Sequence, residues 1–256
     1  MTEVVTSFYL MRNYFQAPWK IKDLITALLI SAVLLLIFNF TFQYFRLDEM
    51  MKESSFKTAY TVMFFAVQWV IFLLPLLFVG PGYKKLDWQK FGFKKYSLLK
   101  SVGLILRGYF LYLLISFLIV LVVIYGDLRV PGYQVEWNIF NFFDDNLHSL
   151  IIAGVLVVII GPILEELFFR GFLLRTLCDK AGLIFGSIVS AGLFAILHMP
   201  WQNIIPVFIL GLIINSMVIK SKSLWPAIGF HIFNNAIAFV VQFLLFKEII
   251  SMETLV

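Results

Sequence analysis

Long apolar runs separated by short polar segments dominate the pattern of this chain. A helix that crosses a bilayer needs about 20 apolar residues, and seven runs approach or exceed that length. They are Leu24–Phe45, Ala59–Val79, Val102–Tyr125, Ser149–Leu177, Leu183–His198, Ile204–Ile219 and Leu224–Phe246. The strict alternation of apolar and polar residues that marks membrane β-strands does not occur. We therefore predict an all-α polytopic membrane bundle of about seven transmembrane helices, within a range of six to eight.

The composition supports a membrane environment. Of the 256 residues, 61% are hydrophobic and only 14% are charged, whereas soluble domains carry roughly 25% charged residues. The net charge of +5 would suggest a nucleic-acid partner in a soluble protein. Here we attribute it to loop lysines that meet anionic lipid headgroups, so we predict the lipid bilayer and no nucleic acid as a partner. The single cysteine, Cys178, excludes an intrachain disulfide.

The loops predict how the chain is organised and oriented. We find no internal repeat and no low-complexity linker, so residues 24–256 are expected to form one transmembrane bundle after an N-terminal segment, 1–23, without a cleavable signal. If that segment is cytoplasmic, thirteen lysines and arginines fall in inner segments and five in outer ones. The positive-inside rule favours this orientation. The Lys-, Ile- and Phe-rich composition is typical of a low-GC bacterium, which predicts a multi-pass protein of the bacterial plasma membrane.

Three charged residues interrupt the fourth apolar run, in the stretch GPILEELFFR. A charge at the centre of a spanning helix costs about 2.5–3.5 kcal/mol on insertion scales. Glu166 and Arg170 lie four residues apart, on one face of a helix, and can form an ion pair there. Glu165 lies five residues from Arg170 and faces elsewhere, so it has no partner in its own helix and becomes a functional candidate. The alternative is that all three side chains reach water at the cytoplasmic end of a long helix.

Two histidines also lie within apolar sequence. His198 ends the stretch SAGLFAILH, and His231 precedes Asn235 by one helical turn, with Asn234 as an alternative to Asn235. If the fourth and fifth helices form a hairpin that turns near residue 180, Glu165 and His198 both lie about 22–27 Å from the turn. His231 joins them if the hairpin extends about 10 Å beyond the inner hydrocarbon boundary. We therefore predict a pocket of Glu165, His198, His231 and Asn235.

This set of side chains predicts hydrolysis. No GxSxG motif is present, and the cysteine is not near a predicted histidine. A carboxylate beside a histidine can hold and deprotonate a water molecule. A second histidine and an amide can donate hydrogen bonds to the oxyanion that forms when water attacks a carbonyl. The pattern therefore favours peptide or ester hydrolysis by an activated water.

Three segments resemble the motifs of a known family. The stretches EELFFR, FAILH and HIFNN are similar to the EExxxR, FxxxH and HxxxN motifs of the CAAX-processing and bacteriocin-immunity (CPBP) family of intramembrane proteases. All three occur in the family's order, each on its own predicted helix. The resemblance covers roughly residues 145–246, which we take as the catalytic core.

The resemblance implies a role for each matching residue. Glu165 would activate the attacking water with help from His198, and His231 and Asn235 would stabilise the oxyanion. Three supporting residues follow from the same motifs: Glu166 and Arg170 for the integrity of the site, and Phe194 beside the histidine one turn later. It also implies a glutamate-type membrane endopeptidase without a required metal or cofactor. Its substrate would be a membrane-anchored protein or peptide, in bacteriocin immunity, peptide maturation or CAAX-type processing.

Three alternatives stay open. Glu165, His198 and His231 could ligate zinc, with a water as fourth ligand, in a membrane metalloprotease. A non-enzymatic immunity or scaffold protein could keep the same fold. A transporter could use the buried glutamate and histidines as a proton relay, although the absence of repeats speaks against it.

Overall fold

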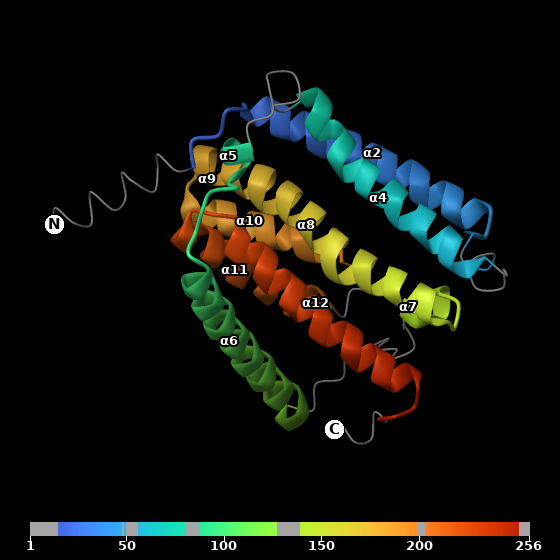
Figure 1. The fold of residues 1–256 in the computed structure, drawn as a ribbon. Helices are drawn as coiled ribbons and strands as arrows, with labels where there is room; N and C mark the ends of the chain where they lie inside the picture. Colours follow the sequence, from blue (N-terminus) through green and yellow to red (C-terminus); the bar gives the residue numbers. More distant parts are fainter. Residues whose placement is uncertain are drawn as a thin grey trace. The chain divides into compact units, whose positions relative to one another are not determined.

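The computed structural model describes residues 15–47, 49, 56–79, 88–126, 139–198 and 203–250, and within these ranges it contains helices and no strand (Figure 1). The elements are α2 (Ile21–Tyr44), α4 (Lys57–Val79), α5 (Trp88–Phe91), α6 (Leu98–Tyr125), the 3₁₀ turn η2 (Ile139–Phe142), α7 (Leu147–Gly154), η3 (Val155–Ile160), α8 (Gly161–Glu166), η4 (Leu167–Leu174), α9 (Arg175–Ala181), α10 (Leu183–Ile196), α11 (Ile204–Ser221) and α12 (Trp225–Phe246). The predicted all-α class is confirmed.

Among the described residues, six helical stretches are long and apolar enough to cross a membrane. They are Ile21–Tyr44, Lys57–Leu77, Leu98–Tyr125, Leu147–Ala181, Ile204–Ser221 and Trp225–Phe246. The fifth predicted span, Leu183–His198, corresponds to α10, whose 14 residues reach about 21 Å at 1.5 Å per residue, short of a ~30 Å hydrocarbon core. The polytopic helical bundle with six to eight spans is confirmed. Of the predicted cytoplasmic segment 1–23, residues 1–14 lie outside the described residues, and its sidedness stays a prediction.

The described residues form two compact units, each assembled from separate stretches of the chain. The first unit contains residues 15–24, 88–126, 165–198 and 203–231. The second contains residues 25–47, 49, 56–79, 139–164 and 232–250. The predicted single bundle over 24–256, with 145–246 as its catalytic core, stays a prediction.

One long helix carries the charged stretch, and two parts of it are wound more widely than an α-helix. The helix runs from Leu147 to Ala181, and its segments η3 and η4 are π-helical. At the end of η3, the N–H of Gly161 donates to the carbonyl of Leu156, five residues back. Proline removes one backbone donor and crowds the preceding turn, and a π turn is a known way to absorb such a disturbance. The disturbance expected from Pro162 in α8 is therefore matched by the π segment directly before that helix.

A tight turn joins the long helix to α10 in the first unit. Gly182 has a φ of +86°, a conformation that L side chains avoid and glycine tolerates. Gly186 follows one turn later, and a Cβ placed on it would come within 2.7 Å of the backbone nitrogen of Cys178. These two glycines let α9 and α10 run back on each other in close contact. The predicted hairpin with its turn at Asp179–Gly182 is confirmed, and α10 also packs on α11 (Figure 1).

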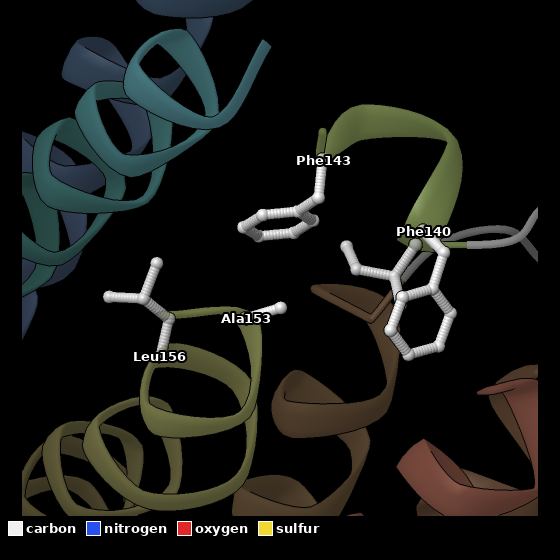
Figure 2. Packing of buried hydrophobic residues seen from close by; sticks show 5 residues of the cluster. Phe140, Phe143, Ala153 and Leu156 are labelled. Atoms are coloured by element: carbon white, nitrogen blue, oxygen red, sulfur yellow. The ribbon is translucent and has the colours of Figure 1, made fainter. Parts of the chain in front are cut away.

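The second unit has an aromatic core of its own. Its buried members are Ile139, Phe140, Phe143, Ala153 and Leu156. Figure 2 shows the ring of Phe143 directed toward Ala153 and Leu156. The ring of Phe140 lies 5.0–5.5 Å from the ring centroids of three phenylalanines on α12: Phe239, Phe243 and Phe246. The segment η2 is thereby attached to α7, η3 and α12.

Replacing Phe140 by alanine is expected to destabilise the protein by about 3 kcal/mol, because the ring fills a space that its neighbours cannot fully close. The measurement is the free energy of unfolding in mixed micelles. Phe40→Ala is the matched control, since the Phe40 side chain in α2 is 69% exposed, and it should change the free energy much less. Equal effects of the two substitutions would contradict the packing assigned to Phe140.

Candidate active site

The two adjacent glutamates at the end of α8 have different surroundings. Successive helix residues point about 100° apart, so the two carboxylates leave the helix in different directions. The side chain of Glu166 is completely buried, whereas that of Glu165 keeps 28% of its surface exposed. Glu166 is therefore enclosed by protein, whereas small molecules can reach the side chain of Glu165.

The predicted ion pair between Glu166 and Arg170 is confirmed. Nη1 of Arg170 donates to Oε1 of Glu166 at 2.9 Å, and both side chains are fully buried. The Arg170 Nε donates to Oδ1 of Asn215 at 3.0 Å, and Nη2 lies 3.4 Å from the carbonyl of Gly211. The guanidinium carbon lies 4.2 Å from the ring centroid of Phe194, a cation–π distance. A buried charge needs such a complete set of partners to offset its desolvation.

His231 is held by the same buried glutamate. Its Nδ1 lies 2.8 Å from Oε1 of Glu166, and a carboxylate that pairs with an arginine can only accept, so Nδ1 carries the proton. The other nitrogen, Nε2, then lies 3.8 Å from Oε2 of Glu165. The contact between His231 and Glu166 is not among the sequence predictions, which paired Glu166 with Arg170 alone.

His198 approaches Glu165 from the end of α10. Its Nδ1 lies 2.7 Å from the carbonyl oxygen of Phe194, which can only accept, so this nitrogen also carries a proton. Its Nε2 lies 3.3 Å from Oε2 of Glu165. The ring of Phe194 lies 4.2 Å from the ring of His198 and 5.7 Å from that of His231, centroid to centroid. The predicted packing of Phe194 beside His198 is confirmed.

Two imidazole nitrogens thus converge on one carboxylate oxygen in the first unit. Oε2 of Glu165 is buried and makes no well-aligned hydrogen bond within the described residues, although Nε2 of His198 lies only 3.3 Å away. Because both Nδ1 atoms are committed as donors, the Nε2 atoms of His198 and His231 are the ones left for chemistry. Such a set can hold water and exchange its proton. In the described part of the chain, no group of three or more acidic, histidine or cysteine side chains is arranged to hold a metal ion.

Asn235 belongs to the second unit. Its Nδ2 donates to the carbonyl of Val157 at 3.0 Å, and Nδ2 of Asn234 lies 3.5 Å from its Oδ1. An amide nitrogen has two N–H groups, so the bond to Val157 leaves one of them for another acceptor. Three of the four predicted pocket residues are therefore brought together within one unit, and the place of Asn235 beside them stays a prediction.

Sequence reasoning missed three residues that hold the buried arginine. Asn215 and Gly211 on α11 contact Arg170 directly. Ser187 on α10 accepts a hydrogen bond from Asn215 through its carbonyl oxygen, at 2.9 Å. The signal for Asn215 was available, because an amide inside the apolar run ILGLIINSMVIK is a polar residue at membrane depth. A backbone carbonyl, as at Gly211 and Ser187, leaves no mark in a sequence.

Comparison with known proteins finds similarity over the part of the chain that carries the motifs. Residues 147–237 match the model of the family described as type II CAAX prenyl endopeptidase Rce1-like. A protein of Bacillus subtilis (strain 168), named "Putative membrane peptidase YdiL", is 24% identical over 98 residues, which cover 38% of this chain and 40% of that protein. The match thus spans well under two thirds of the relative's length. No solved structure matches the chain.

Proposed function

Because the chain is a multi-pass membrane protein with the CPBP-family, Rce1-like segment at residues 147–237, we propose that it is a glutamate-type endopeptidase that hydrolyses peptide bonds with an activated water. The supporting observation is the approach of Nε2 of His198 to Oε2 of Glu165, at 3.3 Å. A water molecule that bridges a carboxylate and an imidazole loses its proton to them as it attacks a carbonyl. The proton then passes to the nitrogen of the leaving amine when the peptide bond breaks.

We assign stabilisation of the oxyanion to His231 and Asn235. With Nδ1 bonded to Glu166, His231 can donate to an oxyanion only through Nε2, as an imidazolium. The second N–H of the Asn235 amide would supply a further donor. Glu166, Arg170 and Phe194 would hold this arrangement and take no part in proton transfer.

The proposed substrate is a membrane-anchored protein or peptide. The carboxylate and both histidines lie on helices within or next to apolar spans, which supports a scissile bond delivered along the membrane. The predicted N-terminus-in orientation would place the site nearer the cytoplasmic face of a bacterial plasma membrane. Bacteriocin immunity, peptide maturation and CAAX-type processing are the roles that fit such a substrate.

A zinc-dependent reaction at the same residues is the second candidate. It is favoured by one observation: both histidines bind a protein acceptor through Nδ1 and direct Nε2 toward Glu165. Histidines that ligate metals commonly have their second nitrogen held in this way. Glu165, His198 and His231 would have to rearrange to act as ligands, because no group of this kind among the described residues is arranged to hold a metal ion as it stands, and the zinc would supply an activated water.

Cleavage of membrane-anchored peptides by the purified protein in liposomes tests the proposal. The panel includes a prenylated peptide and a bacteriocin or pheromone precursor, and cleavage is followed by mass spectrometry. Cleavage that Glu165→Gln and His198→Ala both abolish would support the endopeptidase. If no peptide is cleaved and both variants keep the cellular function of the wild type, a non-enzymatic immunity or scaffold role takes its place.

Removal of metal ions is expected to leave cleavage unchanged, because the proposed nucleophile needs only a carboxylate and an imidazole. The measurement is the cleavage rate before and after incubation with a strong zinc chelator, with a non-chelating isomer of the same compound as the control. Loss of activity with the chelator alone, and its return with added zinc, would establish the metalloprotease.

A further inference from the structure

Asn215 is a fully buried amide on α11, in a helix where Ser216 is its one polar neighbour between Ile204 and Ile219. Its Oδ1 accepts a hydrogen bond from Nε of Arg170 at 3.0 Å. Its Nδ2 donates to the carbonyl of Ser187 on α10 at 2.9 Å and lies 3.3 Å from the hydroxyl of the same serine. Burying an amide is unfavourable unless its polar atoms are paired, and here both ends are paired.

The two partners determine which way the amide points. A guanidinium can only donate and a backbone carbonyl can only accept. The oxygen of Asn215 must therefore face Arg170 and the nitrogen must face Ser187, so the usual ambiguity of amide orientation does not arise. Asn215 is held by the backbone of α10 and presents a fixed acceptor to the arginine.

A continuous series of contacts leads from this amide to the proposed nucleophilic centre. Nη1 of Arg170 and Nδ1 of His231 donate to the same oxygen, Oε1 of Glu166, at 2.9 and 2.8 Å. The position of the guanidinium therefore sets the position of that oxygen, and the oxygen sets the ring orientation and the protonated nitrogen of His231. Nε2 of His231 in turn lies 3.8 Å from Oε2 of Glu165.

We propose that Asn215 is a positioning residue of the active site, which orients Arg170 and, through Glu166, keeps the proton of His231 on Nδ1 and its Nε2 toward Glu165. This inference rests on the proposed function in so far as it concerns catalysis. Asn215 lies outside the three family motifs, and its action is indirect, because it contacts neither Glu165 nor either histidine in the described structure.

Asn215→Leu removes both polar atoms at similar size and leaves Nε of Arg170 without this acceptor. We expect kcat to fall about 10- to 100-fold, by analogy with the range for hydrogen-bond partners that orient the ligands of a metal site, with KM within twofold. Ser216→Ala is the matched control. It deletes a hydroxyl from the next residue of α11, which donates to the carbonyl of Ile213 and not to Arg170 or Asn215, so kcat should stay within twofold of wild type.

The protonation of the two ring nitrogens of His231 can be measured directly by NMR. This measurement distinguishes a positioning role of Asn215 from a general loss of structure. In protein labelled with ¹⁵N in its histidines, the Nδ1 signal of His231 should show a protonated nitrogen in the wild type and in Ser216→Ala. In Asn215→Leu the signal should move toward a mixture of the two tautomers. An unchanged signal together with a kcat within twofold of wild type would overturn the proposal.

Asn215→Asp keeps the test decisive if the leucine variant does not fold. A protonated carboxyl offers one O–H donor and one acceptor oxygen, as the amide does, whereas the ionised form cannot donate to Ser187 and adds a negative charge near Glu166. The kcat of this variant relative to wild type should therefore fall as the pH rises. A constant ratio near one would overturn the proposal.

Failure of this inference is distinguishable from failure of the proposed function. If Glu165→Gln abolishes cleavage while Asn215→Leu alters neither kcat nor the His231 signal, only the positioning role is wrong. If Glu165→Gln leaves cleavage intact, the proposed function is wrong, and the His231 signal still decides whether Asn215 orients the Arg170–Glu166 pair.

Discussion

Glu165→Gln is expected to lower kcat by about 10³- to 10⁴-fold while the protein remains folded. A positioned general base contributes about 10²- to 10⁴-fold to the rate. We expect a loss in the upper part of this range, because the amide of glutamine cannot accept a proton from water. Folding should be preserved, since glutamine has the same size and the Glu165 side chain is 28% exposed. Its neighbour Glu166 carries the buried ion pair and is untouched by the change. The measurement is the initial rate of peptide cleavage in liposomes under saturating substrate.

The control for this substitution is Glu248→Gln, which makes the same chemical change at an exposed position in the second unit. It should leave the rate within twofold of wild type. Thermal unfolding of all three proteins in the same micelles shows whether a lost rate reflects lost structure. A folded Glu165→Gln protein that keeps more than a tenth of the wild-type rate would rule out Glu165 as the general base.

Arg170→Met is expected to destabilise the protein by about 3–5 kcal/mol, because it leaves the carboxylate of Glu166 buried without its cationic partner. Arg170→Lys should also be poorly tolerated. An ammonium group is a compact donor and cannot reproduce a planar fork that meets Glu166, Asn215 and Gly211 together. The measurement is the free energy of unfolding in mixed micelles, together with the cleavage rate.

The double variant Glu166→Leu/Arg170→Met makes the prediction sharper. Replacing a whole buried ion pair by apolar residues is often neutral for stability or even favourable, so most of the lost stability should return. Cleavage should not return, because Nδ1 of His231 loses its carboxylate. Lys247→Met is the control for losing one cation: Lys247 pairs with Asp145 at 2.5 Å, and the Asp145 side chain is 74% exposed. Its effect should be below about 1 kcal/mol. If the double variant regains activity together with stability, the pair serves folding alone.

The sequence was sufficient for the features that depend on local patterning. The number of consecutive apolar residues indicates that the chain spans a membrane. The spanning segments must be helices, because backbone N–H and C=O groups in lipid need hydrogen-bond partners within the chain. Most predicted spans lie within a few residues of the observed helices, as α12 does: it begins at Trp225 where Leu224 was expected. The hairpin at Gly182 and the pair of Glu166 with Arg170 were also predictable, because both join residues that are close in the sequence.

The three-residue cluster was only partly predictable. Counting residues from the hairpin turn placed Glu165 and His198 at one level, and the structure brings them to 3.3 Å. The count could not say how each helix is rotated about its axis. The π-helical segments on either side of α8 change that rotation, because a wider turn shifts every later side chain around the axis. No pattern of residues in the sequence predicts a π-helical segment.

What the tertiary structure alone decided is the pairing of side chains across helices. Nothing in the sequence indicated that Glu166 would bind His231 as well as Arg170, or that Asn215 would lie against the guanidinium. Such contacts join residues 45 and 65 positions apart, and they depend on how α8, η4, α11 and α12 pack. Sequence determines which polar groups are buried in an apolar protein and must find partners. Packing determines which partners they find, because only the folded chain brings distant donors and acceptors within hydrogen-bond distance.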